Sequence, residues 1–278
     1  MTNDSRPTLM SLDSRPRFGV YVGDLARSRA LALSIARNDL QSRQGSLLLG
    51  WIWNLLDPLL MLGVYWLVFG VLLAGRRPDD FLAFLAVGIF LFRFIQGSIV
   101  GGAGSVNRNV GMVRQVRFPR AVLPLAETLR NLLTLLWQLP VILLIVVATT
   151  GTLRAGWVIV AIILLPLLGV FAFGGALFFA RLAASFADVT KLLPYTFRVL
   201  FYASGVLFPI GALVGDHPLG RLIPANPVYA FITLARHLVL EPVAQPAILW
   251  VSAVLWTCVS VAVGLAVFLS AEHRYGRG

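Results

Sequence analysis

The sequence predicts an all-α integral membrane protein with six transmembrane helices, an N-terminal interfacial helix and short external re-entrant half-helices. Its 278 residues are 58% hydrophobic and 13% charged, whereas a soluble domain is about half apolar and about a quarter charged. The apolar residues form long runs, and about 20 such residues in a helix cross a bilayer core. The cations lie between these runs, as the positive-inside rule describes, which argues against nucleic-acid binding despite a net charge of +11.

The chain divides at about residue 46. Residues 1–46 are predicted to form a cytoplasmic tail with an interfacial amphipathic helix, and residues 47–278 the transmembrane domain. Arg29 interrupts the apolar face of the interfacial helix, so a plain solvated helix is the alternative interpretation. The residues that share this face are Leu25, Ala32, Leu33, Ala36 and Leu40.

Length and composition indicate six spans. They cover approximately residues 52–73, 81–104, 126–149, 156–180, 192–214 and 247–270. Arg93 interrupts the second span, and Pro194, Arg198 and Pro209 interrupt the fifth. An even number of spans puts both termini on one side of the membrane, and the arginine-rich connections place that side in the cytoplasm.

Two connections are longer than simple turns. Residues 105–125 form a basic cytoplasmic segment that contains Phe118, Pro119 and Arg120. Residues 206–245 form an external segment rich in Pro and Gly, and it is too apolar for a solvated loop. Short half-helices that dip into the outer leaflet would satisfy its backbone within protein.

The motifs of several enzyme classes are missing from the sequence. The chain has no P-loop, no Gly-x-Ser-x-Gly motif and no histidine pair at metal-ligand spacing. Acidic residues within the spans are sparse, namely Asp57 and Glu127. We therefore expect a protein that is not an enzyme and binds no cofactor or metal of its own.

Several stretches resemble the ABC-2-type exporters of lipid-linked polysaccharide, O-antigen and teichoic acid. The strongest are 37–40 (RNDL), 45–60 (GSLLLGWIWNLLDPLL), 64–65 (VY), 68–70 (VFG) and 109–125 (NVGMVRQVRFPRAVLPL), and weaker ones are 186–189 (FADV), 208–209 (FP) and 226–227 (NP). The resemblance implies a homodimeric permease in the bacterial cytoplasmic membrane, served by two copies of a separate ATPase that uses ATP and Mg. The expected substrate is a lipid-linked glycan, which would approach from the surrounding membrane lipid.

In this family the second cytoplasmic segment contacts the ATPase. A short helix around 106–114, anchored by Phe118 and Pro119, would give the ATPase a stiff element to push. Alternatively, its arginines only set the topology. The expected ATPase-coupling residues are Val106, Asn107, Arg108, Asn109, Met112, Arg114, Arg117, Phe118, Pro119 and Asp188.

Aromatic rings suit a sugar polymer, because stacking on the flat faces of sugars is weakly directional and tolerates sliding. Tyr65 and Phe69 share one helix face, Tyr195 and Tyr202 share another, and these four rings are expected to line the substrate path. The alternative is packing, or contact with lipid.

Arg93 is expected either to pair with Asp57 or to face the path and contact a substrate phosphate; the pair is favoured. Arg37 and Arg43 lie where a lipid headgroup would enter, although general attraction to anionic lipid also accounts for them.

Three other functions remain open. A purely structural membrane scaffold fits the spans but leaves the basic segment from Arg108 to Arg120 unexplained. An ABC exporter of a small hydrophobic drug or lipid would have the same broad fold, with a path that lacks stacking rings. A membrane-embedded glycosyl- or phospho-transferase would need paired acidic residues for a metal at the cytoplasmic face, and the sequence offers no such pair.

Overall fold

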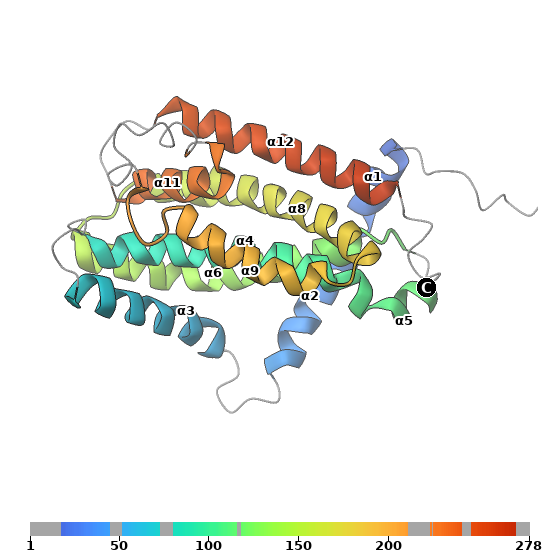
Figure 1. Ribbon diagram of the computed structural model, residues 1–278, viewed down its shortest axis with the longest axis horizontal. Helices are drawn as coiled ribbons and strands as arrows, with labels where there is room; N and C mark the ends of the chain where they lie inside the picture. The colour runs from blue at the N-terminus through green and yellow to red at the C-terminus, as the bar shows by residue number, and fades with distance from the viewer. Residues whose placement is uncertain are drawn as a thin grey trace, which may run out of the picture.

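The computed structural model describes residues 18–44, 52–72, 80–115, 118–210, 223, 225–240 and 246–270, and these form helices and turns (Figure 1). Two helices are extended by π-helical segments, Trp66–Leu72 after α3 and Val160–Leu164 before α8. The helices are α1 (Phe18–Arg27), α2 (Arg29–Gln44), α3 (Ile52–Tyr65), α4 (Phe81–Arg108), α5 (Val110–Gln115), α6 (Val122–Thr150), α7 (Gly156–Ile159), α8 (Leu165–Ser185), α9 (Val189–Ala203), α11 (Pro227–Val239) and α12 (Ala247–Leu269).

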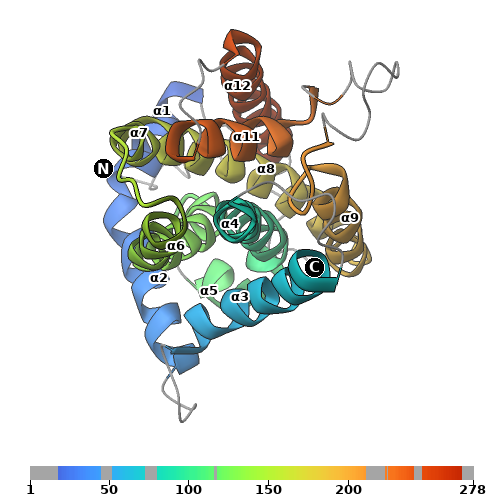
Figure 2. The ribbon, with the colours of Figure 1, turned by 90° about the vertical axis from the view of Figure 1, so that its left-hand side faces the viewer.

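Helix α4 lies at the centre of the bundle. In the end-on view α3, α6, α8 and α9 surround it, and α12 packs outside α8 (Figure 2). Among the 18 most apolar consecutive residues of α4, 78% are buried. The corresponding share is only 17% in α6 and in the stretch formed by α3 and the π-helical segment after it. The outer helices therefore leave large apolar side chains exposed, as helices that face lipid or another subunit do.

Five helical stretches in the described part of the chain are long and apolar enough to cross a membrane. They correspond to the first, second, third, fourth and sixth expected spans, so the all-α membrane fold is confirmed. The five stretches are Ile52–Val71, Phe81–Arg108, Val122–Thr150, Gly156–Ser185 and Ala247–Leu269.

The expected fifth span, 192–214, is not one continuous helix. Helix α9 has 15 residues and ends at Ala203, so it is only about 22 Å long. The chain turns at Ser204 and Gly205, and Gly205 has a φ of 67°, which favours glycine. Residues 211–214 lie outside the described part.

The N-terminal helices cross the end of the bundle where α5 lies (Figure 1). Leu25, Ala32 and Ala36 of the expected apolar face are buried, and α2 packs against α6. Leu33 and Leu40 are half-buried, while Arg29 is exposed. The helix is therefore docked on protein along this face and is not fully solvated.

Helix α11 lies across the opposite end of the bundle (Figure 2). Nine of its 13 residues are buried. Asn226 begins the helix, because its Oδ1 accepts from the backbone N–H of Val228 at 3.0 Å while its Nδ2 donates to Ser204 Oγ at 3.0 Å. Asn226 thus connects α11 to the turn after α9. Within the segment 206–245, which the sequence predicts to be external, residues 211–222, 224 and 241–245 lie outside the described part.

Candidate functional site

The expected coupling helix around 106–114 is interrupted at Asn109. Helix α4 continues to Arg108, and α5 begins at Val110. Asn109 Nδ2 donates to Ser105 O at 2.8 Å, which holds the side chain against the preceding turn. The six residues of α5 therefore form a separate short helix, and Val106, Asn107 and Arg108 belong to the last turn of α4.

Helix α5 has one buried and one exposed side. Val113 is buried in a cluster with Val122 and Leu123, and Phe118 packs against the same cluster. Met112 is 38% exposed, and Arg114 is exposed as well. The buried side fixes α5 to the bundle, and the side that carries Met112 and Arg114 stays accessible.

The other coupling candidates lie near this short helix or near the turn between α8 and α9. Asn107 Nδ2 donates to Ala183 O at 3.1 Å, so the ends of α4 and α8 are held together. Asp188 is exposed directly before α9, and Pro119 is half-buried. Arg117 lies outside the described residues.

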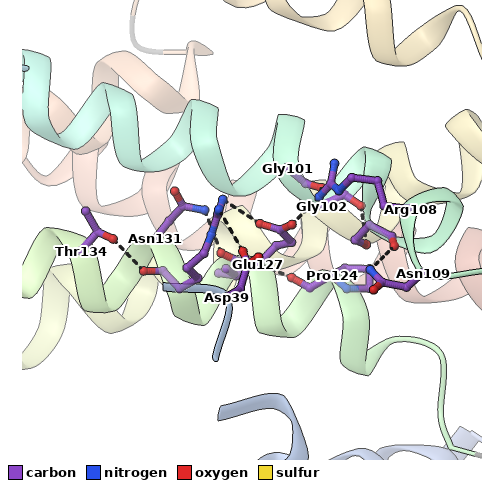
Figure 3. A network of polar contacts seen from close by, with 12 residues as sticks. Asp39, Gly101, Gly102, Arg108, Asn109, Pro124, Glu127, Asn131 and Thr134 are labelled. Carbon is purple, nitrogen blue, oxygen red and sulfur yellow. Dashed lines mark hydrogen bonds and ion pairs between the residues drawn. The ribbon is translucent and has the colours of Figure 1, made fainter. Parts of the chain in front are cut away.

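Arg108 does not project away from the bundle. Its Nη2 donates to Gly101 O at 2.8 Å and forms an ion pair with Glu127 Oε1 on α6 (Figure 3). The side chain of Glu127 is 10% exposed. Such a buried carboxylate needs cationic partners, because an uncompensated charge at this depth is costly.

The second partner of Glu127 extends this ion pair into a network. Arg130 Nη2 lies 2.7 Å from Glu127 Oε2, and Arg130 Nη1 donates to Asp39 Oδ2 at 3.1 Å. We call Asp39, Arg108, Glu127 and Arg130 the charge network; its two cations and two anions balance. It joins α2 to α6 and to the C-terminal end of α4 (Figure 3).

A polar cavity of about 470 Å³ lies between α3, α4 and α6. Asp57 on α3 and Arg93 on α4 form an ion pair at its wall, so the pairing favoured from the sequence is present. Asn54, Gln96 and Asn131 also line it. We call this the α3–α4–α6 cavity.

Two of the four rings expected to line a path, Tyr65 and Tyr202, lie within hydrogen-bonding reach of each other, whereas Phe69 and Tyr195 have other surroundings. Tyr65 stacks on Phe201, with ring centroids 5.6 Å apart, and Phe69 meets the ring of Phe208 edge-on at 5.1 Å. These contacts place Tyr65 and Phe69 against the packed core between α3 and α9. Tyr195 and Tyr202 are 63% and 52% exposed on the outer side of α9.

The two arginines expected near a lipid headgroup are both on α2. Arg37 is exposed. Arg43 lies in the last turn of the helix, and its side chain is outside the described part of the structure. Among the described residues, no three His, Cys, Asp or Glu side chains gather closely enough to hold a metal ion.

The family of this chain follows from comparing its sequence with those of known proteins. Residues 30–240 match the family described as ABC-2 type transporter, which is most of the chain. This chain belongs to that family. As an ABC-2 chain with five helices able to span a bilayer, it is a multi-pass protein of the inner membrane.

Several curated relatives are similar over nearly their whole length. An O-antigen export system permease protein of Myxococcus xanthus is 26% identical over 86% of this chain and 94% of its own. One of the same name from Klebsiella pneumoniae is 26% identical over 88% and 93%. A polysialic acid transport protein of Escherichia coli is 24% identical over 84% and 91%.

Sequence reasoning singled out neither Arg130 of the charge network nor the buried Arg236 on α11.

Arg236 lies in the middle of a group of backbone carbonyls. It is 5% exposed, and it donates to Phe84 O at 3.1 and 2.9 Å, to Gly205 O at 2.7 Å and to Val206 O at 2.8 Å. Its guanidinium also lies 3.4 Å from the ring centroid of Phe84. An arginine within an apolar helix was the available signal, because such a cation must find partners.

Proposed function

We propose that this chain is the permease subunit of an ATP-driven exporter that moves a lipid-linked polysaccharide outward across the inner membrane. The observation that carries the proposal is the similarity, over 86% of this chain, to an O-antigen export permease. A polymer of O-antigen type or teichoic-acid type is the proposed cargo. Both termini, and the end of the bundle that carries α5, lie in the cytoplasm in this proposal.

The energy for export comes from a separate ATPase, which binds ATP and Mg. The proposed assembly contains two copies of each chain. Helix α5 is the proposed contact, because Met112 is exposed while Val113 anchors the same helix in the bundle. The turn before α9, which contains Asp188, is the second contact. The hydrogen bond from Asn107 to Ala183 supports a joint response, since it ties the two regions together.

A homodimer is proposed because the outer sides of α3 and α9 remain open in one chain. Val64 and Leu67 are 59% and 53% exposed, and Val199 is 69% exposed. A second copy, related by a two-fold axis, would cover these faces and enclose a path wide enough for a polymer. Tyr195 and Tyr202 would then face that path from α9.

The test is co-purification with the ATPase, followed by ATP turnover with and without a lipid-linked glycan. Stimulation by the glycan, together with its delivery to the far side of proteoliposomes, is the expected result. Stimulation by small hydrophobic drugs or plain lipid in its place would favour the alternative exporter. Transfer of sugar or phosphate without ATP would favour a transferase, and absence of any complex with an ATPase would overturn the proposal.

A further inference from the structure

The α3–α4–α6 cavity lies at the depth of the interfacial helix. Leu40 of α2 lines a neighbouring hollow together with Asn54, Thr134 and Gln138, and the last three also line the cavity. Gln138 Nε2 donates to Asn54 O at 2.6 Å, which ties the start of α3 to α6 at this level. A cavity at the depth of α2 is within reach of the part of a lipid where headgroup meets acyl chain.

Several polar groups in the cavity wall have hydrogen-bonding capacity to spare. Arg93 Nη1 contacts Met61 Sδ at 3.6 Å, and a thioether is a weak acceptor. Asp57, 61% exposed, accepts from Arg93 and retains acceptor sites. Within the described part of the chain, the amides of Asn54 and Gln96 make no side-chain hydrogen bond, yet both line the cavity.

The charge balance decides which ligand chemistry fits. Arg93 is neutralised by Asp57, and Arg130, also in the wall, is neutralised by Glu127 and Asp39. A phosphate would have to compete with the Asp57 carboxylate for Arg93 and would then lie beside it, which like-charge repulsion disfavours. Neighbouring hydroxyls can accept from Arg93 and donate to Asp57 at once, and both charges stay paired.

The size and composition of the cavity agree with a small polar ligand. Its volume of about 470 Å³ falls in the range of small-molecule sites, roughly 300–1,000 Å³. Trp53, 42% exposed, is part of the wall and offers an apolar ring beside the amides. A ring next to amides and a paired charge suits the face and hydroxyls of a sugar.

We propose that the α3–α4–α6 cavity binds a sugar unit of the lipid-linked glycan at the cytoplasmic side of the membrane. The hydroxyls of this sugar form hydrogen bonds with Asp57, Arg93, Asn54 and Gln96. The phosphate of the lipid stays outside the cavity. The inference rests on the proposed function, because that function supplies the glycan. The inference adds to the proposed function a sugar-recognition site that lies within one chain. This site is distinct from any export path between two copies.

The experiment measures binding to the full-length chain in lipid nanodiscs, without ATPase or nucleotide. The probes are a short-chain lipid diphosphate bearing a disaccharide, the same lipid diphosphate without sugar, and a diacylglycerol bearing the same disaccharide. The variants are Asn54→Leu and Gln96→Met, which remove amides with little change in volume. Thr196→Val is the matched control, because Thr196 is exposed on α9 and does not line the cavity.

The sugar-bearing diphosphate should bind at least tenfold more tightly than the bare diphosphate. Each cavity variant should remove most of that advantage, and Thr196→Val should keep it. Comparable binding of the diacylglycerol probe would show that the sugar is read on any lipid, whereas weaker binding would assign the glycan's own lipid as the source. Either result supports a sugar site.

Equal affinities for the diphosphate with and without sugar would overturn the inference, and so would cavity variants that behave like Thr196→Val. Thermal unfolding in the same nanodiscs identifies any variant that fails to fold. Gln96→Met then serves alone, because Gln96 is half-buried and its side-chain amide makes no hydrogen bond within the described part of the chain. Normal glycan-stimulated ATP turnover beside a failed binding test would overturn this site alone and leave the proposed function standing.

Discussion

Arg130 of α6 donates from Nη1 to the carboxylate of Asp39 on α2 at 3.1 Å, and its Nη2 lies 2.7 Å from Glu127. Glu127 in turn pairs with Arg108 in the last turn of α4. Helix α2 is thereby connected to the end of α4, next to α5. A displacement of α5 by an ATPase would therefore also strain the ion pair between Arg130 and Asp39, which holds α2 against α6.

Asp39→Asn should loosen α2 from the bundle. The substitution leaves Arg130, 16% exposed, with one carboxylate partner instead of two, which we expect to cost roughly 1–2 kcal/mol. Hydrogen exchange of the α2 amides should accelerate about tenfold, since 1.4 kcal/mol corresponds to a factor of ten. Asp24→Asn is the control, because the Asp24–Arg27 pair is 3.6 Å long and largely exposed. Equal acceleration in both variants would contradict a docking role for Asp39.

Asp57 and Arg93 should be interchangeable for folding but not for glycan binding. Asp57→Arg alone places two cations together, which we expect to cost roughly 3 kcal/mol at this depth. The double variant Asp57→Arg/Arg93→Asp restores the ion pair, so its thermal midpoint in detergent should return to within a few degrees of the original. If the double variant stays as unstable as the single one, the pair does not stabilise the packing of α3 on α4.

Local composition determines most of the spans, which is why five of them follow from the sequence. The end of α9 does not, because it depends on contacts between distant residues. Arg236 donates to the carbonyls of Gly205 and Val206, and Gly205 takes a left-handed conformation. These groups are 30 and 31 positions apart, so hydropathy could not reveal that the helix stops at Ala203.

In the candidate site, too, one contact follows from the local sequence, while others depend on residues far apart in the chain. The Asp57–Arg93 pair follows from the cost of lone charges in apolar spans. Arg108 resembles its exposed basic neighbours in sequence, yet its side chain turns to Glu127, 19 positions away. Asp39 is 91 positions from its partner Arg130, and only the packing of α2 on α6 brings them together.

Arg236→Met should strongly destabilise the end of the bundle that carries α11. It removes four donated hydrogen bonds to three carbonyl groups at a position that is 5% exposed. We expect a loss of about 3 kcal/mol or more in the free energy of unfolding. Arg198→Met is the control, because Arg198 is exposed and lies 5.7 Å from the Tyr195 ring; its loss should be about 0.5 kcal/mol. Similar thermal midpoints for the two variants would rule out a central role for Arg236.

Gly88→Ala should produce a milder form of the same defect. A Cβ at Gly88 of α4 would overlap Arg236 Nη2 and touch Val206. The guanidinium must then move and lose some of its hydrogen bonds, which we expect to lower the free energy of unfolding by roughly 1–3 kcal/mol. Gly63→Ala in α3 has open space around it and should stabilise by roughly 0.5–1 kcal/mol through helix propensity. Thermal unfolding should therefore shift in opposite directions, and a downward shift in both would mean that Arg236 does not explain the first.

Met112→Asp should uncouple the ATPase without unfolding the permease. Met112 is 38% exposed on α5, so the charge disturbs a docking surface while the packing around Val113 remains. Glycan-stimulated ATP turnover should fall at least tenfold, with the thermal midpoint unchanged. Leu153→Asp places the same charge on an exposed apolar residue at the other end of the bundle, where Leu153 is 69% exposed, and it should retain full turnover. If Leu153→Asp lowers turnover as much as Met112→Asp, or neither does, α5 is not the contact through which ATP hydrolysis drives export.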